Sequence, residues 1–167
     1  MHDFEIDAFH EGVHEVHLPV TNINRSIDFY TKKLGFELAF GKRNDPSVLL
    51  LYSKANRRWM LGLFEVDHIE HRHPAEYHVA FKVSEVHVDH MITFLHNQGI
   101  QPLHPSTVPD LGGQEMKEPI VHGWMPAAAV FFRDPDGHLL ELIAYLEENP
   151  DPNFNYRPLS EWRARSN

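Results

Sequence analysis

The chain is 167 residues long, has no cysteine, and carries 15 basic and 24 acidic residues, for a net charge of −9 with histidine neutral. This length predicts one domain, or two small modules that share one core. The acidic balance argues against a nucleic-acid partner, no apolar run is long enough to span a bilayer, and the lack of cysteine excludes disulfide and thiol chemistry. The start of the chain lacks a basic segment, so we expect no signal peptide and a cytoplasmic protein.

The first half of the chain predicts an extension followed by a strand, a helix and three more strands. Residues 1–12 are expected to be an N-terminal extension, and alternating apolar residues predict a strand at about 13–20. Asn22 or Asn24 can cap the next helix, because a short polar side chain accepts hydrogen bonds from free backbone N–H groups. The apolar face of this helix is formed by Ile23, Ile27, Tyr30 and Leu34. The helix ends at Gly35, and strands are expected at 36–42, 48–53 and 59–64.

The second half predicts the same order of elements after a linker at 65–76. A strand at 77–83 alternates strictly between an apolar face and a face with His78, Ala80 and Lys82. A helix from about 86 to 98 follows. Further strands are expected at 100–104, 127–132 and 138–146, with irregular residues and one or two short strands at 105–126. We expect residues 147–167 to be an extended C-terminal tail packed by Phe154, Tyr156 and Trp162, with a second subunit as one candidate surface.

The two halves are tandem copies of one β-α-β-β-β module. Superimposing the strand at 77–83 on the strand at 13–20 places His78 on Glu15. Superimposing the last strands of the two halves places Glu141 on Gly62. We therefore predict a domain at 13–146 that consists of module one at 13–66 and module two at 76–146.

Polar residues occupy the face of each strand that lies opposite its apolar face. Glu15 and His17 lie opposite Leu18 on one strand, and Glu141 lies opposite Leu140 on another. If helices cover the apolar faces, the polar faces line a cavity, where a carboxylate is costly to bury unless it is paired or bound to a metal. The alternatives are a hydrogen-bonded cavity histidine at position 78 and an ion pair of Glu141 with Lys82 or an arginine.

Two motifs carry a family resemblance. The helix of module one contains SIDFY at residues 26–30 and is followed by LGF at 34–36, and module two contains DPDGHLLEL at residues 134–142. With this spacing around a repeat, the chain resembles the vicinal oxygen chelate superfamily, which includes glyoxalase I, bleomycin and fosfomycin resistance proteins, methylmalonyl-CoA epimerase and extradiol dioxygenases. The resemblance implies an α+β fold in which paired modules form a curled, mostly antiparallel half-barrel sheet around a central cavity.

The resemblance also implies a metal site. Its ligand positions fall on Glu15, His78 and Glu141, whereas a fourth position, used in glyoxalase I, falls on Gly62, which cannot be a ligand. Most metal-binding members have histidine where this chain has Glu15, so a shifted register could present His14 or His17 instead. Two carboxylates and an imidazole suit Mn²⁺, Fe²⁺, Zn²⁺ or Ni²⁺. The candidate catalytic residues are Glu15 and His17. The candidate pocket residues are His17, Trp59, His122, Trp124 and Tyr145.

The implied function is that of a metalloenzyme acting on a small molecule. A divalent metal would act as a Lewis acid on a substrate with two neighbouring oxygens, in lyase or isomerase chemistry, and a free carboxylate would move the proton. An extradiol-type dioxygenase is the second interpretation, and it needs His14 or His17 in place of Glu15. The third is a metal-free drug- or ligand-binding protein of the resistance type. The expected partners are a small molecule and a second copy in a homodimer, with no nucleic acid and no membrane.

Overall fold

The computed structural model describes residues 15–51, 60–66, 76–108 and 110–165. The chain divides into two compact units, Met1–Pro74 (unit one) and Ala75–Asn167 (unit two). The predicted extension at 1–12, His14 and Trp59 lie outside the described residues. In the part of the chain that is described, no helix is both long and apolar enough to cross a membrane.

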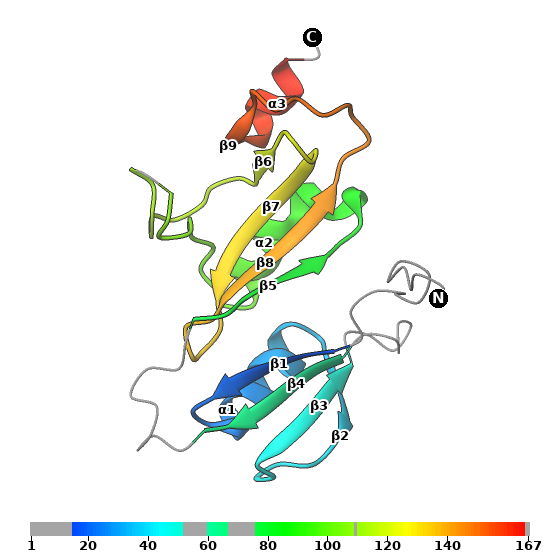
Figure 1. Ribbon diagram of the computed structural model, residues 1–167, viewed down its shortest axis with the longest axis vertical. Helices are drawn as coiled ribbons and strands as arrows, with labels where there is room; N and C mark the ends of the chain where they lie inside the picture. Colours follow the sequence, from blue (N-terminus) through cyan, green and yellow to red (C-terminus); the bar gives the residue numbers. More distant parts are fainter. Residues whose placement is uncertain (1–14, 52–59, 67–75, 109, 166–167) are drawn as a thin grey trace, which may run out of the picture. The chain divides into compact units, whose positions relative to one another are not determined.

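Unit one contains a four-stranded sheet with the strand order β1-β4-β3-β2 (Figure 1). Its elements are β1 (Glu15–Val20), α1 (Ile23–Asp28), the π-helical turn η2 (Phe29–Lys33), β2 (Glu37–Phe40), β3 (Ser47–Leu51) and β4 (Met60–Glu65). β1 and β4 are parallel, and the other pairs are antiparallel. Asn22 caps α1, since its side chain accepts a hydrogen bond of 2.9 Å from the N–H of Arg25. The helical segment is followed by Gly35, whose φ of +79° suits glycine.

Unit two contains a five-stranded sheet with the strand order β5-β8-β7-β6-β9. Its elements are β5 (His78–Lys82), the 3₁₀ turn η3 (Glu85–His90), α2 (Met91–Asn97), β6 (Ile120–His122), β7 (Ala127–Arg133), β8 (Leu139–Tyr145), β9 (Asn155–Pro158) and α3 (Leu159–Ala164). β5 and β8 are parallel, and the other pairs are antiparallel. The predicted α+β class, with two β-α-β-β-β modules and mostly antiparallel pairing, is confirmed.

The predicted strand at 100–104 is wrong. Leu103 forms only an isolated bridge with Glu115, and the second strand of the module is β6. Pro102 and Pro105 flank this bridge and have no N–H to donate to a ladder, which prevents a longer strand here.

The C-terminal residues differ from the predicted extended tail. β9 pairs with β6 at the edge of the sheet, and α3 follows it directly. Trp162 of α3 is fully buried and contacts Phe154 edge-on, with ring centroids 4.9 Å apart. The tail therefore belongs to the sheet and core of unit two, because burial of the tryptophan ring favours the helix that carries it.

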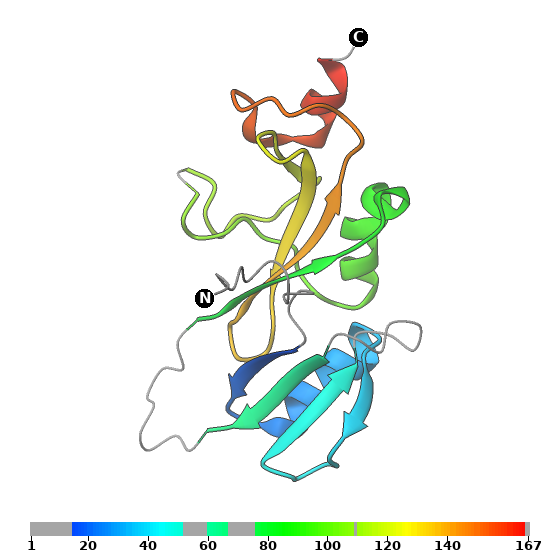
Figure 2. The same ribbon diagram turned by 45° about the vertical axis from the view of Figure 1, so that its right-hand side comes forward.

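The sheet of unit two has an apolar face and an opposite face that carries polar residues. Leu140, Phe132 and Ala144 are fully buried on the apolar face, against which α2 lies (Figures 1 and 2). Neighbouring residues in each strand point to opposite faces, so His78 and Glu141 lie on the polar face. This is the arrangement that the alternation at 77–83 predicts. The polar face carries the candidate site.

Candidate functional site

His78 and Glu141 lie side by side on the polar face of the sheet in unit two. β5 and β8 are parallel, with His78 beside Leu139 and Ala80 beside Glu141, so the two polar side chains start from adjacent strands. His78 Nε2 lies 3.0 Å from Glu141 Oε2, and His78 Nδ1 lies 3.1 Å from the carbonyl oxygen of Leu139. The hydrogen bond with Glu141 raises the pKa of His78, and burial opposes this rise. The carbonyl of Leu139 orients the ring so that Nε2 faces the carboxylate.

Glu141 is the polar group on this face whose bonding is incomplete. Its side chain is buried, and its Oε1 has no hydrogen-bond partner among the described residues. A buried carboxylate oxygen without a partner destabilises the folded state unless a cation or a donor approaches it. Two ligands that each lie near 2.1 Å from one metal ion are about 3.0–3.4 Å apart, which matches the spacing between His78 Nε2 and Glu141 Oε2. This pair therefore fits two ligands of a divalent metal.

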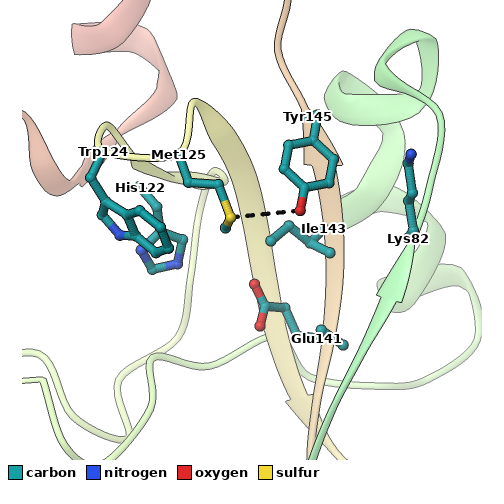
Figure 3. A pocket seen from close by; sticks show the side chains of 8 residues that line it. Lys82, His122, Trp124, Met125, Glu141, Ile143 and Tyr145 are labelled. Carbon is teal, nitrogen blue, oxygen red and sulfur yellow. Dashed lines mark hydrogen bonds between the residues drawn. The ribbon is translucent and has the colours of Figure 1, made fainter. Parts of the chain in front are cut away.

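A hollow of about 430 Å³ adjoins Glu141. It is lined by Ala80, Lys82, His122, Trp124, Met125, Glu141, Ile143 and Tyr145. Figure 3 shows the Glu141 carboxylate in this hollow, with His122 and Trp124 on one side and Lys82 on the other. Burial lowers the pKa of His122, so this imidazole is neutral near pH 7. The structure thus brings together Glu141 and three of the predicted pocket residues, in surroundings suited to an apolar or aromatic ligand with polar groups at one end.

Unit one has a second imidazole–carboxylate pair on the exposed part of β1. His17 Nε2 lies 3.3 Å from Glu15 Oε1, and the side chains are 46% and 41% exposed. His17 lies beside Gly62 in the register of β1 with β4. A Cβ atom at Gly62 would lie 2.5 Å from Nδ1 of His17, so the imidazole ring covers the space that a side chain there would need.

Each unit therefore contains two of the predicted polar site residues, and the two pairs are described separately. Among the described residues, no three histidine, aspartate or glutamate side chains gather in one cluster. Glu15 and His17 form the pair of unit one, and His78 and Glu141 form the pair of unit two.

Tyr156 and His104 are residues near this site that sequence reasoning did not assign to it. Tyr156 occupies a bulge where β9 pairs with β6, and its φ of +51° is unusual for a residue other than glycine. Its ring stacks on Phe131, and its hydroxyl lies 3.2 Å from Nδ1 of His104. Burial, followed by the negative charge of Glu141, raises the pKa of Tyr156. The sequence carries no signal for this placement, because a bulge depends on the pairing of two distant strands.

Comparisons with known proteins agree with this fold. A profile of the Glyoxalase/Bleomycin resistance protein/Dioxygenase superfamily matches residues 12–142. An integron cassette protein from the mobile metagenome of the Halifax Harbour sewage outfall is 27% identical with a TM-score of 0.60, over 81% of this chain and 99% of that chain.

More distant structures share the fold alone. A lactoylglutathione lyase from Agrobacterium tumefaciens is 20% identical with a TM-score of 0.57, over 81% of this chain and 95% of that chain. A fosfomycin resistance protein from Mesorhizobium loti is 14% identical with a TM-score of 0.52, over 83% of this chain and 96% of that chain. The profile match covers most of the chain and contains the motifs of both modules. The chain belongs to the glyoxalase/bleomycin resistance protein/dioxygenase superfamily, also called the vicinal oxygen chelate superfamily.

Proposed function

We propose that this protein is a small-molecule metalloenzyme whose divalent metal is held by His78 and Glu141, with Glu15 as the third protein ligand expected from the sequence. The observation that carries the proposal is the buried Oε1 of Glu141, which has no hydrogen-bond partner among the described residues. A group retained at a cost to stability is typical of a functional site. Mn²⁺, Fe²⁺, Zn²⁺ and Ni²⁺ all suit two carboxylates and an imidazole.

The proposed chemistry is that of a lyase or isomerase. When bound, the metal would supply Lewis-acid polarisation of two neighbouring oxygens of the substrate. The chain's own residues would bind and orient the substrate: Trp124 and Tyr145 provide apolar surface, and neutral His122 offers one hydrogen-bond donor and one acceptor. The proton would be taken up by His17, or by Glu15 once it is released from the metal, since both side chains are exposed enough to exchange it with solvent.

An extradiol-type dioxygenase is the second candidate, and the position of His17 favours it. The imidazole of His17 lies next to Glu15, so unit one could offer a nitrogen ligand in place of a carboxylate. Two histidines and one carboxylate form the ligand set of non-haem Fe²⁺ oxygenases. In that case the protein would consume oxygen with a catechol in the presence of Fe²⁺.

Metal titration of chelator-treated protein tests the proposed site. We expect His78→Ala and Glu141→Gln to weaken binding by more than about 100-fold, since even the loss of groups that only orient ligands costs up to about 100-fold. The matched control is His96→Ala, because His96 forms an exposed pair with Glu115 at 3.3 Å and should leave the affinity unchanged. If all three variants bound the metal with the affinity of the parent protein, the proposed site would be ruled out.

Two activity measurements then separate the candidate reactions. A lyase or isomerase should exchange the C–H proton next to a carbonyl in small hydroxyketones, seen by proton NMR of the metal-loaded protein in D₂O. A dioxygenase should instead take up oxygen with catechol. A protein that takes up no metal but binds a planar aromatic ligand at Trp124 would be a ligand-binding protein of the resistance type.

The proposal includes a homodimer in the cytoplasm that acts on a small molecule. Superfamily members bind small molecules and often act as dimers. Sedimentation of the purified protein measures the mass of the assembly and would reject the dimer if only a monomer of 19.4 kDa were found.

A further inference from the structure

We propose that Gly123 positions Trp124 in the hollow of unit two, because it allows the C-terminal turn at 151–154 to hold the loop at 122–126. Trp124, held in this place, makes the hollow selective for planar aromatic ligands. This inference rests on the proposed function, which takes this hollow as the place where the small molecule binds. The turn lies beyond the profile match at residues 12–142.

The loop at 122–126 joins β6 to β7 and supplies three of the side chains that line the hollow, His122, Trp124 and Met125 (Figure 3). The other lining residues belong to β5 and β8, where the hydrogen bonds of the ladder determine their places. The Trp124 side chain is 60% exposed, so its ring is available to cover a planar ligand. The position of this loop therefore decides how much aromatic surface the hollow presents.

The backbone of Gly123 is hydrogen-bonded to the C-terminal turn through both of its polar groups. Its N–H donates to the carbonyl oxygen of Phe154 at 2.8 Å, and its carbonyl oxygen accepts from the N–H of Asp151 at 2.8 Å. The N–H of Phe154 closes the turn by donating to the carbonyl oxygen of Asp151 at 3.0 Å. The Asp151 side chain accepts from the N–H of Asn153 at 3.1 Å. Because these bonds join the loop to the turn, the turn fixes the residue that precedes Trp124.

Glycine allows the loop and the turn to approach this closely. Gly123 is buried, and a Cβ atom at this position would collide with the carbonyl oxygens of Phe154 and Asp151. Both oxygens are backbone atoms, which cannot rotate away as the end of a flexible side chain can. A glycine next to a strand often marks such a close approach of another backbone. A side chain at position 123 would therefore separate the turn from the loop and move Trp124.

The C-terminal turn is itself anchored in the core of unit two. Phe154 is buried and contacts Trp162 edge-on, with ring centroids 4.9 Å apart. The guanidinium carbon of Arg165 lies 3.0 Å from the centroid of the Trp162 ring, and Arg165 also pairs with Asp151 at 3.1 Å. Burial of the two aromatic rings, together with these contacts of Arg165, holds the turn in place and through it the loop.

The same C-terminal residues hold His122 by a separate contact. Tyr156 occupies the bulge beside the pair of His122 with Asn155, and its ring lies 6.0 Å from that of His122 and stacks on Phe131. The φ of +51° at Tyr156 is unfavourable for a residue with a side chain, so this placement is kept at a local cost. Closing the edge of a sheet requires neither a bulge nor a strained residue. These features favour a role in shaping the hollow.

Titration with a fluorescent dihydroxynaphthalene, a planar two-ring compound with neighbouring hydroxyl groups, tests the proposal. The protein would be treated with a chelator, so that no metal takes part in binding the probe. Gly123→Ala displaces the loop directly. Asp151→Ala is the second variant, and it loosens the turn without added bulk, since it removes the pair with Arg165 and the bond from Asn153. Each is made alone and together with Trp124→Ala, with circular dichroism as a check of folding.

We expect Trp124→Ala to lower the affinity for the probe at least about fivefold, because the contact between aromatic rings is lost. Gly123→Ala and Asp151→Ala should each lower it at least about threefold when made alone, because the indole is then misplaced. Added to Trp124→Ala, each should change it by less than about twofold, because both act through that ring. Arg163→Ala is the matched control and should keep the affinity of the parent, since its ion pair with Asp89 at 2.7 Å joins the tail to η3 instead of the loop.

Three results would overturn the proposal: no loss of affinity in either single variant, a full further loss in the double variants, or no binding of the probe by the parent protein. The Zn²⁺ affinity of Gly123→Ala should equal that of the parent, because His78 and Glu141 lie on other strands. If instead the Zn²⁺ affinity of the parent survives in His78→Ala and Glu141→Gln, the proposed function fails, so the two failures are distinguishable.

Discussion

At the scale of single residues, Glu141 is where stability and function conflict. The carboxylate is 5% exposed, and one of its oxygens has no hydrogen-bond partner among the described residues. The imidazole of His78 forms a hydrogen bond with the other oxygen. The Glu141 carboxylate therefore has one bonded and one unbonded oxygen in a site of low polarity. We infer that a structural role alone would favour an apolar residue here.

The variant Glu141→Leu tests this conflict. In protein stripped of metal, we expect it to raise the free energy of unfolding by about 1–3 kcal/mol, because the unsatisfied carboxylate is removed from a buried site. Chemical denaturation in the presence of a chelator measures the change. Glu115→Leu is the control. The carboxylate of Glu115 is exposed, so its loss should change the free energy of unfolding by no more than about 0.5 kcal/mol. A loss of stability in Glu141→Leu would show that the carboxylate supports the fold.

His104 gives a prediction about pH. Burial lowers its pKa in the folded protein from the ordinary value of 6.5. Well above pH 6.5, His104 is neutral in both the folded and the unfolded protein. As the pH falls below 6.5, the unfolded chain binds a proton at this residue before the folded protein does. The folded protein therefore loses stability as the pH falls. His104→Gln should reduce this loss, and denaturation between pH 5 and 8 on both proteins measures it. An identical pH dependence in the two proteins would contradict the account.

At the scale of elements, some boundaries can be predicted from local sequence and others cannot. Asn22 and Gly35 mark the ends of the first helical segment because capping and a positive φ are local demands. The expected strand at 100–104 is reduced to an isolated bridge, since Pro102 and Pro105 beside Leu103 have no N–H to donate to a longer ladder. The local sequence does not predict α3, because the stability of this helix comes from the burial of Trp162 rather than from its own six residues.

Replacing Trp162 tests whether the C-terminal tail belongs to the core of unit two. Trp162→Ala should lower the free energy of unfolding by about 3–5 kcal/mol, because it leaves a cavity beside Phe154 in the core of unit two. Trp124→Ala is the matched control: that ring is 60% exposed, so its loss should change stability by less than about 1 kcal/mol. Thermal unfolding followed by circular dichroism compares them. Equal effects would mean that the tail does not belong to the core.

β9 also places a phenol near the proposed site. The pKa of Tyr156 lies above the ordinary 10.0, first because of burial and then because of the charge of Glu141. Glu141→Gln should therefore lower the pKa of Tyr156. Absorbance at the phenolate band during alkaline titration, taken as the difference from Tyr156→Phe, isolates this group. A phenol that titrates like an exposed tyrosine in the parent protein would contradict the geometry.

At the scale of the whole molecule, the repeat is what the sequence reveals most clearly. Alternation and the two motifs predict both modules and place Glu15, His78 and Glu141 on polar strand faces, because strand periodicity is a local property. The contact of the His17 ring with Gly62 could not be predicted in the same way. It depends on which residues of β1 and β4 are neighbours, and the register of two strands distant in sequence is set by tertiary packing.

The most direct test of the metal-dependent site is the amount of metal bound per chain. The protein would be purified without a His-tag or a chelating column, and Mn²⁺, Fe²⁺, Zn²⁺ and Ni²⁺ would be offered before elemental analysis at known subunit concentration. We predict about one divalent metal per chain, lost in Glu141→Gln and retained in Glu115→Gln. No bound metal with any of the four ions, or the same content in both variants, would contradict it.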